Sequence, residues 1–310
     1  MMPLDVAQSR ERPRHDHRHR VVGMPMLCLA GTFRILSTEP DGDSIRFYAD
    51  DSAAWARVPG PNAVRTNAGG GAQLRLDGID ALETHYSPRG GGPLHQPVDL
   101  AHQARDELLR WLGFRDVQRT GETVDTATPA QLPGYLLTRG ADVYGRCVAL
   151  VGRGDPPAAS GTQAMVKVAD LRKTANHRLI AAGLAYPTFY LKLFPDLRAE
   201  LAKQAGVARE AKKGVWPGDR DRKGVDVKSL ATLTDDALVL PKLFRRLVDY
   251  LELNDNDPSL AGFSAYLAQR NDPVFILSTG HYTGFDFVVD VRGQVVRLTT
   301  DPEDLVFQEA

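Results

Sequence analysis

The chain has 310 residues, and its 43% hydrophobic and 25% charged residues are typical of an ordinary globular protein. This composition excludes collagen-like, fibrous and largely disordered proteins. The two cysteines, Cys28 and Cys147, are too far apart in the sequence for a zinc cage or a disulfide framework, which favours a reducing compartment. The first 220 residues are basic and the remainder is acidic, so the charge permits nucleic-acid binding without requiring it.

The first residues of the chain have little apolar content, and we expect residues 1–24 to form a disordered extension. The apolar run that follows, "VVGMPMLCLAG", is too short to span a bilayer. It continues directly into "TFRILSTE", a strand-like alternation, so it does not resemble a signal peptide. We therefore expect a cytoplasmic protein that does not enter a membrane.

The next part of the sequence predicts short strands joined by turns. "GTFRILSTE" and "SIRFYAD" flank the turn "PDGD", and "AQLRLDGI" follows. A helix is expected over about 99–112, where leucines and alanines recur on one face until Gly113. The strands "GYLLTRG" and "RCVALVGRG" come after this helix.

Two more helices are expected, over about 170–183 and about 196–214. The second of them ends in lysines, which interact favourably with the helix dipole. Five or so short strands with helices between and after them predict an α+β fold that is mainly a small closed β-barrel.

Charged residues gather at the turns of this predicted barrel. The stretch "RLDGIDALETHY" at 75–86 follows a buried strand, "DGD" occupies 41–43, and "DVYGR" occupies 142–146. Each is ordinary by itself, because Asp-Gly turns are common and alternating charges suit the outward face of a strand. Their order and short spacing are what make the combination specific.

Taken together, these motifs resemble the staphylococcal nuclease (thermonuclease) family. "NHRLIAAGLA" is similar to the second helix of that family, and "AKKGVWPGD" is similar to the end of its third helix. The resemblance covers roughly residues 27–218 and departs from the family at Ala81-Leu82, where Thr-Pro is common. It implies an OB-fold, a five-stranded barrel with three helices, which binds nucleic acid on one face.

The resemblance also implies roles for individual residues. Arg75 and Arg146 would bind phosphate oxygens and Glu83 would accept a proton from attacking water, so these three are the expected catalytic residues. Asp43 and Asp80 would bind the metal, which in this family is calcium, with magnesium as a possible substitute. Asp41 would lie behind these ligands, and Tyr144 and Tyr190 would contact the substrate.

After this region, residues 219–235 form a charged, glycine-containing run that predicts a linker. Residues 236–310 predict a small α+β domain, with an amphipathic helix in "LPKLFRRLVDYLEL" and a hairpin at Arg292-Gly293. This domain carries no recognised chemical motif and is an accessory domain that could bind a protein partner. We expect residues 25–218 to fold without it.

The sequence thus predicts a calcium-dependent nuclease, a phosphodiesterase that cleaves DNA or RNA internally and prefers single strands. The alternative is an OB-fold module that binds nucleic acid or a protein without catalysis. All five charged site positions are present, and this favours the enzyme.

Overall fold

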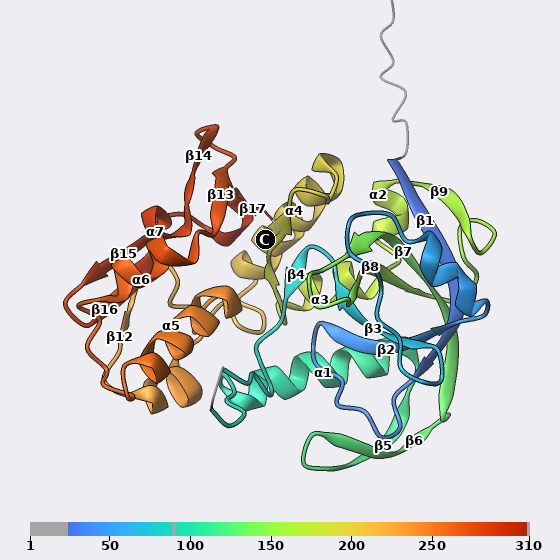
Figure 1. The fold of residues 1–310 in the computed structure, drawn as a ribbon, viewed down its shortest axis with the longest axis horizontal. Helices are drawn as coiled ribbons and strands as arrows, with labels where there is room; N and C mark the ends of the chain where they lie inside the picture. Colours follow the sequence, from blue (N-terminus) through green and yellow to red (C-terminus); the bar gives the residue numbers. More distant parts are fainter. Residues whose placement is uncertain (1–23, 89–90, 309–310) are drawn as a thin grey trace, which may run out of the picture.

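The computed structural model describes residues 24–88 and 91–308, and its first part is a closed β-barrel (Figure 1). Strand β2 pairs with β1 as well as with β3, which closes the ring. All neighbouring pairs in the ring are antiparallel except β3 and β8, which are parallel. The strands of the ring, in spatial order, are β1 (Met24–Arg34), β2 (Ser44–Ala49), β3 (Gly71–Leu76), β8 (Cys147–Arg153) and β7 (Gln131–Ala141).

This arrangement confirms the predicted α+β class with a closed, OB-like barrel. Ile45 and Phe47 on β2 are buried while Arg46 and Tyr48 are half-buried, which is the alternation expected of a strand with one face in a core. Phe47 packs against Phe33 of β1, with ring centres 4.9 Å apart. The predicted extension at 1–24 lies outside the described residues, apart from Met24, which begins β1.

Helices pack around the barrel near the predicted positions. Helix α1 (Val98–Leu112) lies between β3 and β7 in the sequence and ends at Gly113, whose φ of 116° permits the left-handed turn. The helix expected over 170–183 is instead broken into α2 (Val168–Leu171) and α3 (Ala175–Ala182). The break occurs because Thr174 is extended and its side chain caps a new helix by accepting from the backbone N–H of His177. Helix α4 (Pro195–Glu210) follows.

Short strands connect these elements. Two of them, β4 (Ile79–Asp80) and β10 (Tyr186–Pro187), pair antiparallel beside the barrel. A hairpin follows α1, a sixth strand pairs with β1, and one more short strand lies before α4. These are β5 (Arg115–Thr120), β6 (Thr123–Thr128), β9 (Thr162–Val166) and β11 (Phe189–Tyr190), and a 3-10 helix covers Ser52–Arg57.

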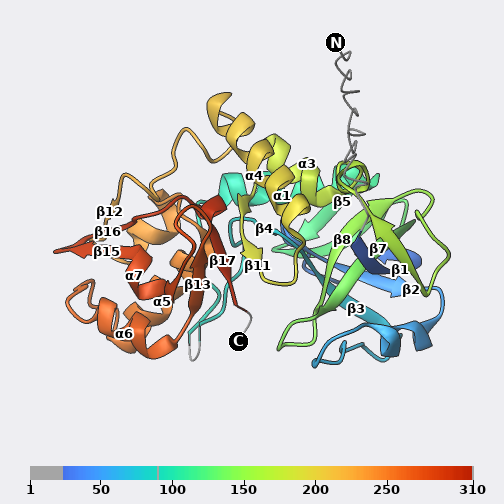
Figure 2. The ribbon, with the colours of Figure 1, turned by 90° about the horizontal axis from the view of Figure 1, so that it is seen from above.

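The C-terminal part combines helices with two small sheets (Figure 2). One sheet has the order β11-β17-β13-β14, so it includes a strand from the region before α4, and the other has the order β12-β16-β15. The predicted hairpin at Arg292-Gly293 is confirmed by the pairing of β15 with β16. The elements are β12 (Val225–Asp226), α5 (Pro241–Leu253), α6 (Phe263–Arg270), β13 (Pro273–Ile276), β14 (His281–Gly284), α7 (Phe285–Val288), β15 (Val289–Arg292), β16 (Val295–Leu298) and β17 (Leu305–Phe307).

The predicted linker, residues 219–235, is packed into this part of the molecule. Asp221 is 1% exposed, and its carboxylate accepts from the backbone N–H of Leu240 at 2.9 Å. Val225, Val227 and Leu233 are buried while most of the charged residues of the run point outward. The run is therefore charged in composition, but its apolar residues are spaced so that they enter the hydrophobic core.

One hydrophobic cluster extends from the barrel into the C-terminal part. It includes Phe33 and Phe47 of the barrel as well as Phe244, Phe285 and Phe307. β11 and β17 pair in parallel across the two parts, with Phe189 beside Val306. The independent folding of residues 25–218 stays a prediction, and this shared cluster bears directly on it.

Within the described ranges, no helix combines the length and the apolar character that crossing a membrane requires.

Candidate active site

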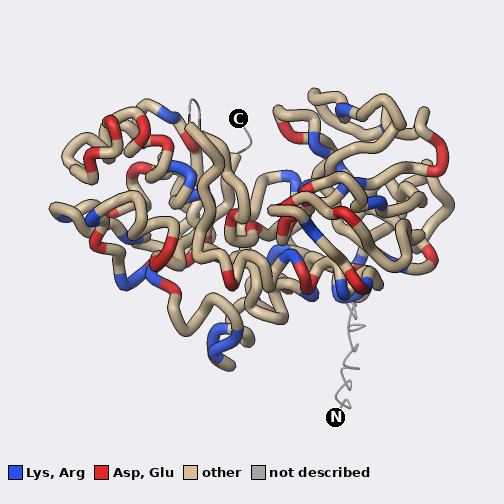
Figure 3. The backbone as a smooth tube through the Cα atoms, turned by 90° about the horizontal axis from the view of Figure 1, so that it is seen from below, with Lys and Arg blue, Asp and Glu red and all other residues tan. Residues whose placement is uncertain are grey.

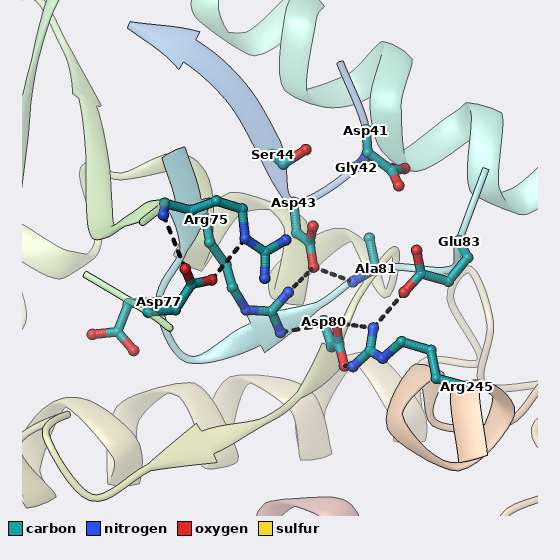
Figure 4. Close-up of polar contacts among 12 residues, drawn as sticks. Asp41, Gly42, Asp43, Ser44, Arg75, Asp77, Asp80, Ala81, Glu83 and Arg245 are labelled. Carbon is teal, nitrogen blue, oxygen red and sulfur yellow. Dashed lines mark hydrogen bonds and ion pairs between the residues drawn. The ribbon is translucent and has the colours of Figure 1, made fainter. Parts of the chain in front are cut away.

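Two turns bring the acidic residues of the predicted site together at one edge of the barrel (Figure 4). Asp41 and Asp43 lie in the turn that enters β2, and Asp80 and Glu83 lie in and just after β4. The two turns touch at Gly42, where an added Cβ would lie only 2.6 Å from the Cβ of Ala81. A glycine is therefore required for this approach, which places all four carboxylates on one side of the barrel.

Arg75, near the end of β3, connects the two turns. Its Nη1 donates to Oδ2 of Asp43 at 3.4 Å, and its Nη2 donates to Oδ1 of Asp80 at 3.1 Å. Burial alone would lower the pKa of Arg75, but the charges of Asp80 and Asp43 raise it. Arg75 thus remains a cation held between two carboxylates.

Asp43 and Asp41 lie in an environment that disfavours their charge. Burial raises the pKa of Asp43 to about 7, with Arg75 opposing this rise and Asp80 and Glu83 adding to it. Burial, followed by the charges of Glu83 and Asp43, raises the pKa of Asp41 well above its usual range. Burial is thus the main cause of both raised pKa values, and repulsion from the neighbouring carboxylates adds to it.

Asp80 is the most deeply buried of the four, with a side chain that is 0% exposed. It accepts from Arg75, and also from Arg245 of α5, whose Nη1 and Nη2 lie 3.3 Å and 2.7 Å from the two carboxylate oxygens of Asp80. Burial alone would raise the pKa of Asp80, but Arg245 and Arg75 outweigh burial and lower it. Asp80 is therefore a buried anion between two arginines.

Glu83 is half-buried and lies at the same arginine. Its Oε1 accepts from Nη1 of Arg245, and its backbone N–H donates to Oε1 of Gln96 at 3.3 Å. Gln96 in turn donates to the backbone carbonyl of Val239 at 2.9 Å, just before α5. Glu83 is thereby fixed against the C-terminal part through both its side chain and its backbone.

Arg146 reaches the same sheet from a different turn. It lies two residues before Val148, the partner of Arg75 in the parallel β3–β8 pair, so both arginines start from the same face of the sheet. Its Nε donates to Oδ2 of Asp142 at 2.7 Å, within its own turn. Arg146 is therefore brought near the site by the register, while its ion pair is with Asp142.

The two predicted substrate-contacting tyrosines differ in exposure. Tyr144 is 70% exposed, and its ring centre lies 5.6 Å from the guanidinium carbon of Arg146. Tyr190 is half-buried in β11, with its ring centre 6.0 Å from that of Phe307.

Arg245 and Gln96 are the site residues that the sequence did not predict. Arg245 lies in the amphipathic stretch "LPKLFRRLVDYLEL", where an arginine is expected to face solvent. The available signal was weak: Arg245 and the adjacent Arg246 point about 100° apart around the helix, so the sequence does not show which of them turns toward the barrel.

The carboxylates do not fit a calcium ion in this arrangement. A calcium site needs several oxygen atoms directed at a shared position, whereas both oxygens of Asp80 and Oε1 of Glu83 accept hydrogen bonds from Arg245. Asp43 Oδ2 accepts from Arg75 and from the backbone N–H of Ala81. Across residues 24–88 and 91–308, no group of three or more His, Cys, Asp or Glu side chains is placed to hold a metal. Calcium binding stays a prediction from the resemblance.

The fold and site define a class, an α+β protein with a closed OB-like barrel and a cluster of carboxylates and arginines at its edge. A scan against protein-family models found no match, and a search among curated proteins also found none. The resemblance to the staphylococcal nuclease family therefore rests on the motif residues of this sequence.

Proposed function

We propose that this protein hydrolyses phosphodiester bonds of nucleic acids through attack by water. The observation that supports this function best is the position of Arg75, a buried cation held between Asp43 and Asp80 with Glu83 nearby. Cleavage of a phosphodiester places negative charge on the phosphate oxygens in the transition state, so the catalyst must present fixed cations. The site has such cations together with carboxylates that can accept a proton.

The roles of the residues follow from their chemistry. Arg75 and Arg146 would bind phosphate oxygens through the guanidinium N–H groups that their bonds to Asp43, Asp80 and Asp142 leave over. Glu83 would accept the proton of the attacking water, and the buried Asp80 keeps Arg75 in place. Asp43 has the same positioning role from the other turn. No step of this mechanism passes through a metal ion.

The expected substrate is single-stranded DNA or RNA. An OB-like barrel offers a face on which unstacked bases can lie, and the exposed Tyr144 beside Arg146 is suited to stacking. Lysine and arginine are interspersed with aspartate and glutamate in both parts of the molecule (Figure 3), so recognition would depend on this local surface more than on an overall positive field.

A second candidate function is binding of nucleic acid without cleavage. The contact between Arg245 and Glu83 favours it, because that contact occupies Oε1 of Glu83, one of the two oxygen atoms that would accept a proton from water. A protein partner for the C-terminal part also stays a prediction from the sequence.

The test is incubation of the full chain with labelled single-stranded DNA, duplex DNA and RNA, each with calcium, with magnesium and with chelator. We expect cleavage, fastest on single strands, and at least about a hundredfold slower cleavage by Arg146→Ala. Arg110→Ala, which removes an arginine that is 66% exposed, is the control. Binding of single strands without cleavage in every condition would establish the second candidate instead.

A further inference from the structure

Arg245 joins the two carboxylates that the site depends on most. Its Nη2 lies 2.7 Å from Oδ2 of Asp80, and its Nη1 donates both to Oδ1 of Asp80, at 3.3 Å, and to Oε1 of Glu83. The guanidinium is thus a bridge between Asp80 and Glu83 and uses the oxygen atoms that a metal ion would need (Figure 4). The side chain of Arg245 is only 18% exposed, so water competes weakly for these bonds.

The helix that carries Arg245 is fixed against the site. The hydroxyl of Tyr86, three residues after Glu83, donates to Oδ1 of Asp249 on α5 at 2.7 Å, and the ring of Tyr86 packs edge-on against Phe244 of the same helix. Gln96 is 0% exposed and connects Glu83 to Val239. These contacts lie on both sides of Arg245, so its position is set by the packing of α5.

A guanidinium and a divalent cation cannot share these oxygen atoms. Both need the same lone pairs of Asp80 and Glu83, and two cations at contact distance would repel each other strongly in a site that excludes water. Arg245 has the advantage that it is part of the fold, so its binding carries no cost of association.

We propose that Arg245 is the resident cation of this site and that it occupies the position between Asp80 and Glu83 that a divalent metal would otherwise take. This inference rests on the proposed function only for the importance of Asp80 and Glu83. It has two consequences: the wild-type protein binds divalent cations poorly at this site, and removal of Arg245 creates a metal site that the wild type lacks.

The experiment measures metal binding, independently of any cleavage. Calcium binding is measured by titration calorimetry, and terbium binding by luminescence, for the wild type, Arg245→Gln, Arg245→Lys and Arg246→Gln. Arg246→Gln is the matched control, because it removes the same charge from the same helix while its guanidinium pairs with Asp272. Circular dichroism verifies that each variant is folded.

We expect Arg245→Gln to bind calcium at least about tenfold more tightly than the wild type, with an increase in its melting temperature when calcium is added. Arg246→Gln should behave like the wild type, and Arg245→Lys should lie between, since lysine keeps the charge but not the bridge. Should Arg245→Gln require calcium to fold, that requirement also supports the proposal.

Tight calcium or terbium binding by the wild type that is lost in a folded Glu83→Gln variant would overturn the proposal, and this arm needs no variant of Arg245. Equal calcium affinity of the wild type and Arg245→Gln would overturn it as well. If instead the metal results agree with the proposal but no nucleic acid is cleaved under any condition, the proposed hydrolysis fails while the role of Arg245 stands.

Discussion

Arg245 forms a bidentate ion pair with Asp80, a residue 165 positions earlier in the sequence. The pair joins the C-terminal helix α5 to the edge of the barrel at the most deeply buried carboxylate of the site. Because Arg75 binds the same carboxylate from the barrel side, Asp80 connects the two parts of the molecule electrostatically.

Asp80→Asn should strongly destabilise the fold. The substitution removes a buried anion and leaves Arg75 and Arg245 facing each other without a shared counter-charge, which typically costs roughly 3–5 kcal/mol. Urea unfolding followed by circular dichroism measures the loss. Asp50→Asn, at an exposed aspartate, should change the stability by less than about 0.5 kcal/mol. Similar free energies of unfolding for the two variants would show that Asp80 does not contribute this stability.

Asp43→Asn should change how stability depends on pH. The folded-state pKa of Asp43 is about 7, raised from an ordinary 3.8, so folding favours its protonated form. The stability that this group contributes is fully present at low pH and is lost as the pH rises from about 4 towards 7.

Asp43→Asn stays neutral throughout this range. It should therefore lose less stability than the wild type between about pH 4 and pH 8, by on the order of 1–4 kcal/mol. Urea unfolding at several pH values measures the difference, with Asp50→Asn as the control. Parallel pH profiles for the wild type and Asp43→Asn would contradict the raised pKa.

A chain that ends at residue 218 should fail to fold cooperatively. From the sequence we expected residues 25–218 to fold alone, but the shared hydrophobic cluster leads to the opposite prediction. The truncation removes β17, the partner of β11, and Asp219, which accepts from the buried hydroxyl of Tyr186 at 2.9 Å. Thermal melting monitored by circular dichroism tests this. A sharp transition at the melting temperature of the full chain would support independent folding of residues 25–218.

The barrel could be predicted because its signals are local. The alternation in β2, the turn at Asp41 to Asp43 and the stop at Gly113 depend on neighbours in the sequence, and the structure confirms them. The break at Thr174 was missed because the apolar spacing continues across it, while the capping side chain that interrupts the helix is also compatible with a helix interior.

The carboxylates Asp80 and Glu83 could also be predicted from a local signal, because they are only three residues apart in the sequence. Arg245 was not, because nothing in an amphipathic helix indicates which distant carboxylate an arginine will meet. Gln96 was missed because a buried glutamine is recognised only by its partners, Glu83 and Val239. The burial of the run at 219–235 could not be predicted either. Its charges predict exposure to solvent, and only tertiary contacts bury Asp221.

The most direct test of the account is the rate of cleavage of single-stranded DNA by the wild type and by Glu83→Gln, measured side by side in chelator. We expect the wild type to cleave without added metal, and Glu83→Gln to be slower by at least about a hundredfold with an unchanged circular dichroism spectrum. Glu210→Gln, at an exposed glutamate of α4, is the control and should keep the wild-type rate. Equal rates for the wild type and Glu83→Gln, or no cleavage by the wild type in chelator, would contradict the proposed hydrolysis.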